Sequence, residues 1–453
     1  MTTGLVCCIA AFMVCAYFAH RSLGAGVVAL TAVGCAYGVL RANFLDMFSY
    51  FIFDCGVVGF YAALLAAPLT PGEDAAGLTV KRWLRFLIGW PVLLFFLPIN
   101  HYLVQLVGLR HIIFFLPAML YGTRLKRRDL ETMALGFAVL CSLEFGVALL
   151  EYFGGIGLLF PRNAVTEIMY RSHDIRTSEG LFHRIPATFS SSHIYAANML
   201  LTLPFLLNAL TDSKHSAGRR TMMGVASVLA VLGIFIAGPR VPVVCLTAWL
   251  VLMAVMPGLK PEARWRLAGC VLVIGAVAAY YIVSDERMQR FTSLMDVEKV
   301  EQRAAGSYEY GIFESIVRFP IGVGLGGAVG SSMPYFLKDL KPDQVGAENE
   351  YIRIAVEQGI VGLLIWVAFL VSLALHRPSP VSRRWRLGIH AMHTLALVSW
   401  ATAFVGTGIL QGIPSAFLLV LQIGLVLRSP LEQQAHGPSF GRVPTRIPPH
   451  EAV

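Results

Sequence analysis

Long apolar runs separated by short polar segments recur along almost the whole chain. A helix needs about 20 residues to cross a hydrocarbon core of about 30 Å, and these runs have that length. Backbone polar groups in lipid must be satisfied within the segment, so runs of this kind form helices. The pattern therefore predicts an all-α, polytopic integral membrane protein with about 12–14 transmembrane helices and two large polar loops on one face.

The predicted spans follow one another closely in the first half of the chain and are separated by long loops later. They cover residues 3–19, 24–40, 47–67, 83–99, 105–121, 132–152, 193–210, 221–237, 242–257, 267–283, 353–375, 388–409 and 414–428. The first run lacks the basic n-region and cleavage site of a secretory signal, so it is expected to remain as a span. Around Asn100 the pattern is also compatible with a re-entrant piece or a short outer helix.

Short basic clusters between the spans predict the orientation of the helices. They lie at 81–82, 124–128, 214–220, 260–266 and 383–386. The positive-inside rule places all of them in the cytoplasm, which leaves loops 153–192 and 284–352 on the outer face. Loops of this length are usually functional or disordered. The side of the N-terminus stays open, and the Pro-rich segment 429–453 is predicted to be a disordered cytoplasmic tail.

Composition narrows the classes of partner and ligand. Apolar residues make up 56% of the chain and charged residues 14%, and the net charge of +9 comes from basic clusters at helix ends, so no nucleic-acid partner is expected. All eight cysteines lie in apolar runs, which excludes a disulfide framework in the loops. His173, His183 and His193 match no familiar zinc spacing, so no metal site is expected either.

Arg240 is a candidate anion-binding residue. It follows Gly238 and Pro239 at an outer helix boundary, and Pro242 opens the next span as a first-turn proline would. The free N–H groups and the dipole of that helix end, added to a guanidinium, favour a phosphate. The alternative is an interfacial arginine that reaches toward lipid headgroups.

The end of the second outer loop carries a polar cluster at the membrane mouth, formed by Glu348, Asn349, Glu350, Tyr351 and Arg353. A half-buried carboxylate beside an arginine can serve as a general base. The alternative is an ordinary helix N-terminus whose acidic residues interact favourably with the helix dipole.

Residues 322–327 match the spacing G-x-G-x-x-G, but no βαβ unit surrounds them, so the pattern does not indicate a dinucleotide site. It predicts a tight turn, introduced by Pro320, that lets the backbone pass close to something bulky or to another helix. Asp54 and Glu144 lie at mid-membrane depth, which would suit a secondary transporter. Either acid could instead be a protonated group hydrogen-bonded between helices.

The order of these elements resembles the O-antigen ligase and polymerase superfamily of bacterial membrane glycosyltransferases, from about residue 130 to about 410. The segment from Arg184 to Asn198, which includes His193, looks like the family's arginine-led entry into a span, and 237–240 is similar to its small-residue–arginine turn. Arg303, Arg318 and the glycines around Gly324 resemble the large outer loop of the family. Residues 348–362 look like the close of that loop.

The resemblance implies a protein of the bacterial inner membrane that moves a glycan from a polyprenyl diphosphate carrier onto an acceptor hydroxyl at the periplasmic face. It implies no metal and no other cofactor. Residues 1–131 would form N-terminal helices, and 132–428 the ligase- or polymerase-like domain. The implied partners are the lipid-linked glycan and the bilayer, and a chain-length regulator and a flippase of the same pathway are candidates.

The resemblance also assigns roles to residues. It implies Arg240, then Arg184 and Arg303, as ligands of the diphosphate, and a substrate-binding set of His193, Arg318, Gly324, Asn349, Glu350 and Tyr351. Ligases of the family have a histidine beside the asparagine of the closing motif, where this chain has Glu348. This departure favours an exopolysaccharide or O-antigen polymerase with Glu348 as its base and Glu350 as the alternative. A ligase is the second reading, and a transporter is the alternative from another class.

Overall fold

The computed structural model describes residues 2–66, 75–172, 174–177, 180–212, 214–255, 312–328, 333–340, 350–379, 381–404 and 409–429, with single positions at 269, 275, 276 and 280. Apart from one short hairpin, the regular structure in these residues is helical. Within these described ranges, eight helices are long and apolar enough to span a membrane, and two shorter ones are also apolar. The prediction of an all-α, multi-pass membrane protein is confirmed.

The elements of the first half are α1 (Thr3–Arg21), α2 (Leu23–Asn43), η1 (Met47–Phe51), α3 (Ile52–Leu65), α5 (Leu78–Phe95), α6 (Tyr102–Ile113), α7 (Ala118–Arg124), α8 (Arg127–Gly154), η2 (Ile156–Leu158), α9 (Glu167–Ser172), β1 (Asp174–Thr177) and β2 (Gly180–His183). Those of the second half are α10 (Ser192–Thr211), α11 (Ala217–Ala237), α12 (Arg240–Val255), α16 (Glu314–Arg318), η6 (Tyr335–Leu340), α17 (Glu350–Leu375), η7 (Arg383–Trp385), α18 (Arg386–Thr402) and α19 (Ser415–Val426).

Each predicted span except 267–283, which falls almost wholly outside the described residues, coincides with a helix or a pair of helices. The irregular region around Asn100 is a break between α5 and α6. The span that follows it is itself divided into α6 and α7 near Pro117, which lacks an N–H and cannot continue a helical ladder.

The hairpin of β1 and β2 lies in the first outer loop, where the sequence predicts no strand. The strands are antiparallel and pair Asp174 with His183 and Thr177 with Gly180. Each strand has only four residues, too short for period-two alternation to be recognised in the sequence.

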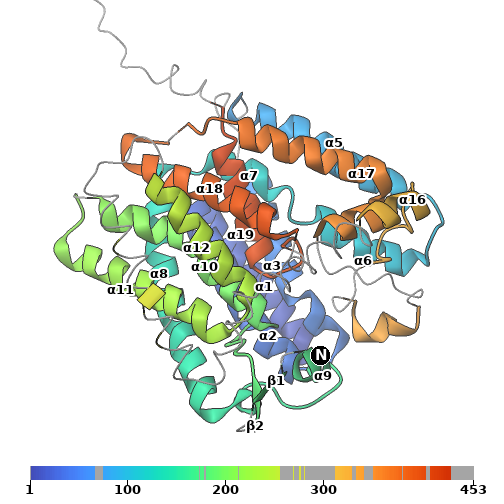
Figure 1. The fold of residues 1–453 in the computed structure, drawn as a ribbon, viewed down its shortest axis with the longest axis horizontal. Helices are drawn as coiled ribbons and strands as arrows, with labels where there is room; N and C mark the ends of the chain where they lie inside the picture. Colours follow the sequence, from blue (N-terminus) through green and yellow to red (C-terminus); the bar gives the residue numbers. More distant parts are fainter. Residues whose placement is uncertain are drawn as a thin grey trace, which may run out of the picture.

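The helices at the centre of the bundle are mostly covered by the other helices. In α10, 72% of the residues in its most apolar 18-residue stretch are buried, and every residue of α19 is buried. Figure 1 shows α10, α12, α18 and α19 crossing in the middle of the molecule, with α5 and α17 side by side at its edge. Trp83 of α5 donates to the Ser372 hydroxyl of α17 at 3.2 Å.

Basic residues from distant parts of the chain meet at one end of the bundle. Arg219 donates to the Glu131 carbonyl at 3.2 Å, and Arg428 to the Leu125 carbonyl at 3.2 Å. Lys126, in the adjoining basic cluster 124–128, donates through its backbone N–H to Asp129 at 2.9 Å. Arg219 and Lys126 belong to clusters that the sequence predicts to be cytoplasmic, and Arg428 ends the last predicted span, just before the predicted cytoplasmic tail.

The opposite end of the bundle holds the first outer loop and also the start of the chain. Asn43, at the end of α2, donates to the Leu159 carbonyl at 3.0 Å. The backbone N–H of Gly4 donates at 2.8 Å to Asp46, which follows α2. Figure 1 shows the N-terminus near α9 and the hairpin. The start of α1 therefore lies at the end of the bundle opposite the basic residues, and the predicted cytoplasmic placement of the basic clusters would put it on the outer face.

Candidate functional site

A cavity of about 1020 Å³ opens among the helices toward the loop end. Its wall includes residues of α2, η1, α3, α6, α10, α12 and α18. The first outer loop contributes Thr166, Met169 and Ser190, and the second contributes Pro334 and Phe336. Two loops that are far apart in the sequence and predicted to share one face thus line a single cavity.

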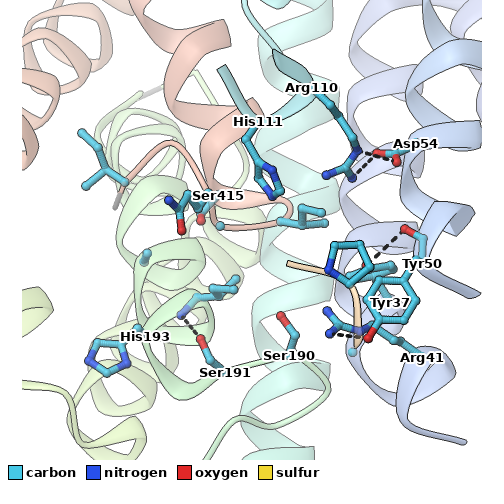
Figure 2. Close-up of a pocket in the computed structure, with 18 of the residues that line it drawn as sticks. Tyr37, Arg41, Tyr50, Asp54, Arg110, His111, Ser190, Ser191, His193 and Ser415 are labelled. Carbon is cyan, nitrogen blue, oxygen red and sulfur yellow. Dashed lines mark hydrogen bonds and ion pairs between the residues drawn. The ribbon is translucent and has the colours of Figure 1, made fainter. Parts of the chain in front are cut away.

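One side of the cavity carries an arginine held by tyrosines. Arg41, in the last turn of α2, places its guanidinium 4.1 Å from the centre of the Tyr50 ring and donates through Nη2 to the Tyr50 hydroxyl at 3.1 Å. The Tyr37 hydroxyl donates to the Tyr50 carbonyl at 3.3 Å. Figure 2 shows these three side chains gathered on the same wall.

A second arginine of this wall is paired with an acid. Arg110 of α6 donates two hydrogen bonds to Asp54 of α3, from Nε to Oδ2 at 2.7 Å and from Nη2 to Oδ1 at 2.5 Å. This bidentate pair satisfies both side chains and links two helices across the wall (Figure 2). Asp54 therefore forms an interhelical ion pair, and its position does not require an ion-transport role.

The other side of the cavity begins at α10 and α12. His193, in the first turn of α10, lines the cavity on the side away from Arg41 (Figure 2). Gly238 ends α11 at φ 91°, a conformation that glycine adopts without strain, and α12 starts at Arg240. Val241 and Pro242 line the cavity, so the first turn of α12 faces it. Arg240 itself is half-buried and is not among the residues that line the cavity.

The segment that leads into α10, around Thr188 and Phe189, is hydrogen-bonded to both α2 and α8. The Thr188 hydroxyl donates to Glu144 of α8 at 2.6 Å, and the Thr188 carbonyl accepts from the Val39 N–H of α2 at 3.1 Å. A Cβ at Gly38 would lie 2.2 Å from the backbone of Phe189, so only glycine permits this crossing. Glu144 thus fastens the entry segment of α10, as one of the two readings of this acid predicts.

The glycines around Gly324 form a brace between two helices. Gly322, Gly324 and Gly326 have φ of 92°, 86° and 82°. A Cβ at Gly326 would lie 2.3 Å from the Val104 carbonyl of α6, while the Val323 N–H donates to the Val356 carbonyl of α17 at 2.7 Å. The predicted close approach to another helix is confirmed. Gly324 contacts Ile99 and Asn100 and is not among the residues that line the cavity.

Glu350 lies in a buried ion triad at the start of α17. Arg353 donates to Glu350 through Nε at 2.9 Å, with a second bond from Nη2, and to Glu357 through Nη1 at 3.1 Å. The exposed fractions are 0% for both glutamates and 2% for the arginine. Glu357 also accepts from the Ala328 N–H at 3.2 Å, which ties the glycine brace to α17. Glu350 is thereby engaged in holding the fold together.

The remaining predicted residues are dispersed. Tyr351 donates to the Trp400 carbonyl at 2.9 Å and packs on its ring, while Arg318 is exposed, with its guanidinium 5.4 Å from the Phe319 ring. Arg184 follows β2 and is half-buried. None of these three lines the cavity. Glu348, Asn349 and Arg303 lie outside the described residues.

Arg41, Tyr50 and Arg110 are cavity residues that sequence reasoning missed. Arg110 lies within an apolar run, so the rule that singles out Asp54 as a costly intramembrane charge applies equally to it. Arg41 and the tyrosines carry no comparable signal, because interfacial tyrosine and arginine are ordinary at helix ends. Among the residues that the structure describes, no group of three or more His, Cys, Asp or Glu side chains could hold a metal ion.

Comparison with known proteins identifies one part of the chain. Residues 225–367 match a family model described as O-antigen ligase. This stretch begins in α11 and ends in α17, and it contains Arg240, Arg303, the glycine brace and the polar cluster at 348–351. No curated protein matches the chain. The match shows that residues 225–367 of this multi-pass membrane protein are similar to the O-antigen ligase family.

Proposed function

We propose that this protein is a polymerase that joins polyprenyl-diphosphate-linked oligosaccharide repeat units into exopolysaccharide or O-antigen at the periplasmic face of the inner membrane. The observation that carries the proposal is the meeting of both outer loops with the first turn of α12 around one cavity. The O-antigen ligase family acts on polyprenyl-linked glycans in the membrane, and its model covers that turn.

In the proposed reaction the acceptor hydroxyl oxygen attacks the anomeric carbon of the donor glycan. A new glycosidic bond forms as the bond from that carbon to the diphosphate oxygen breaks, and the diphosphate leaves with the electron pair. Arg240 and the free N–H groups of α12 would stabilise the charge that develops there. Glu348 would take the proton of the acceptor hydroxyl. Arg184 and Arg303 are the next candidates for the diphosphate.

The polymerase is preferred to a ligase because Glu348 stands where ligases have a histidine. A ligase of the same family, which attaches finished glycan to a lipid or protein acceptor, is the alternative. A strain that lacks the protein separates the two. Loss of long chains with accumulation of single repeats supports a polymerase, whereas free polymer without its final anchor indicates a ligase.

The catalytic assignment is tested by Arg240→Ala and Glu348→Gln, assayed for polymer length in that strain. Removing a group that stabilises transition-state charge costs about 100- to 1000-fold in rate, and removing a general base costs about 100- to 10,000-fold, so both variants should leave single repeats. Arg82→Ala is the matched control, because this arginine of α5 is exposed, does not line the cavity and belongs to a predicted cytoplasmic cluster. If both variants insert at normal levels and build polymer at the parent rate, the assignment is wrong.

A further inference from the structure

Arg41 differs from the other arginine of its wall in having no carboxylate partner among the described residues. Arg110 is neutralised by the bidentate contact with Asp54. Arg41 has tyrosine neighbours in place of a carboxylate: it donates to the Tyr50 hydroxyl and lies over the Tyr50 ring, Tyr37 lies beside it, and its Nε is buried without a hydrogen-bond partner. The cavity wall therefore contains a cation whose charge the described side chains do not balance.

Such a charge is costly at the edge of a membrane, because burial removes hydration that only an opposite charge or a full set of acceptors replaces. The planar guanidinium of arginine suits the paired oxygens of a carboxylate or a phosphate. The Tyr37 and Tyr50 side chains beside Arg41 add apolar ring surface and hydroxyl groups, a combination that can contact a sugar.

We propose that Arg41 and Tyr50 form a subsite for an anionic group, a carboxylate or a phosphate, of the glycan substrate. The subsite lies across the cavity from His193 (Figure 2). It belongs to α2 and η1, outside the residues 225–367 that match the family model, so that match does not account for it. The inference rests on the proposed function for the kind of molecule that enters the cavity.

The anion has two sources that the same chemistry would accept: an acidic sugar of the repeat unit, or the diphosphate of a lipid carrier. Binding to the purified full-length protein in detergent distinguishes them. The probes are an oligosaccharide that contains glucuronic acid, its neutral glucose counterpart, and farnesyl diphosphate. We expect one anionic probe to bind the parent more tightly than the neutral probe does. The anionic probe whose binding weakens when Arg41 is replaced identifies the source of the anion.

Arg41→Met, which keeps the bulk and removes the charge, should weaken binding of that probe on the order of tenfold to a hundredfold, the range for a lost hydrogen bond to a charged group. Arg41→Lys keeps the charge but loses the fork, so it should fold and show a smaller loss. Arg21→Met is the matched control, because exposed Arg21 also lies over a tyrosine, 4.8 Å from the Tyr17 ring, at the basic end. It should bind as the parent does.

Equal binding of all three probes by the parent and both Arg41 variants would overturn the subsite, as would failure of the parent to bind either anionic probe. Failure of the subsite is distinguishable from failure of the proposed function. If the parent polymerises lipid-linked repeats but the Arg41 variants bind every probe as the parent does, only the subsite is wrong. If an anion binds through Arg41 but no glycan is transferred, the subsite stands and the proposed function falls.

Discussion

Three acidic side chains that the sequence suggests as catalytic or ion-binding groups instead form contacts that stabilise the packing of the helices. Glu350, Asp54 and Glu144 each have a defined partner in the structure: Arg353, Arg110 and Thr188, respectively. A buried carboxylate is costly unless it is paired, so such partners explain the acids without a transport role. These three acids therefore help to maintain the fold. Glu348 differs from them, because the family resemblance makes it a candidate base.

Arg353→Met tests the structural role of the ion triad. The change leaves Glu350 and Glu357 buried without a counter-ion, which costs about 3–5 kcal/mol. We expect a large loss of folded protein, measured by thermal unfolding in detergent followed by size-exclusion chromatography.

The control for this prediction is the triple variant Glu350→Gln, Arg353→Met, Glu357→Gln, which removes all three charges. It should recover much of the lost stability, since replacing a whole buried triad is far less costly than breaking it. A stable Arg353→Met protein would show that the triad contributes little and would reopen Glu350 as a candidate base.

At the scale of elements, irregular backbone holds the parts of the site in place. The glycine brace passes between α6 and α17 and is tied to Glu357. The entry segment of α10 crosses α2 at Gly38 and is fastened to α8. Both arrangements depend on positions where a side chain has no room.

Gly326→Ala should destabilise the brace by about 2 kcal/mol or more, because alanine is strained at φ 82° and its Cβ would lie 2.3 Å from the Val104 carbonyl. Gly146→Ala is the matched control in α8, where an added Cβ meets nothing within 4 Å. It should be neutral or mildly stabilising, since alanine is the better helix former. Equal melting temperatures for the two variants would contradict the proposed brace.

The sequence predicts helices far better than it predicts the site. Spans follow from runs of apolar residues, a local property, and the turn at the glycines follows from their spacing. The cavity depends on which helices are neighbours, which the sequence pattern does not reveal. Arg41 and Phe336 are about 300 positions apart, yet both line it. Arg240 was found because a helix boundary marks it, whereas Arg41 lies at a boundary without any distinctive motif.

At the scale of the whole molecule, the two ends of the bundle differ in chemistry. Arg219 and Arg428 lie at the basic end, while the first outer loop and the start of α1 lie at the other. The positive-inside rule predicts that the end with the two loops faces outward, with the basic end in the cytoplasm.

Cysteine labelling in intact cells tests this orientation. Thr2→Cys and Ala164→Cys, both exposed at the loop end, should react with a membrane-impermeant maleimide added from the periplasmic side. Gly218→Cys, at the basic end beside Arg219, should react only after the membrane is opened. The parent chain corrects for its native cysteines. Labelling of Gly218→Cys but not Ala164→Cys in intact cells would invert the topology.

The central claim is that the cavity beneath the two outer loops holds the reacting glycan. The most direct measurement is the rate at which purified protein in vesicles transfers lipid-linked repeats when a bulky side chain fills the cavity. Ala197→Trp places a bulky ring in the cavity wall, and Ala10→Trp places the same ring on the exposed face of α1. We predict transfer at least about tenfold slower for Ala197→Trp and unchanged for Ala10→Trp, because displaced reactants lose their alignment. Transfer at the parent rate by a folded Ala197→Trp protein would contradict the claim.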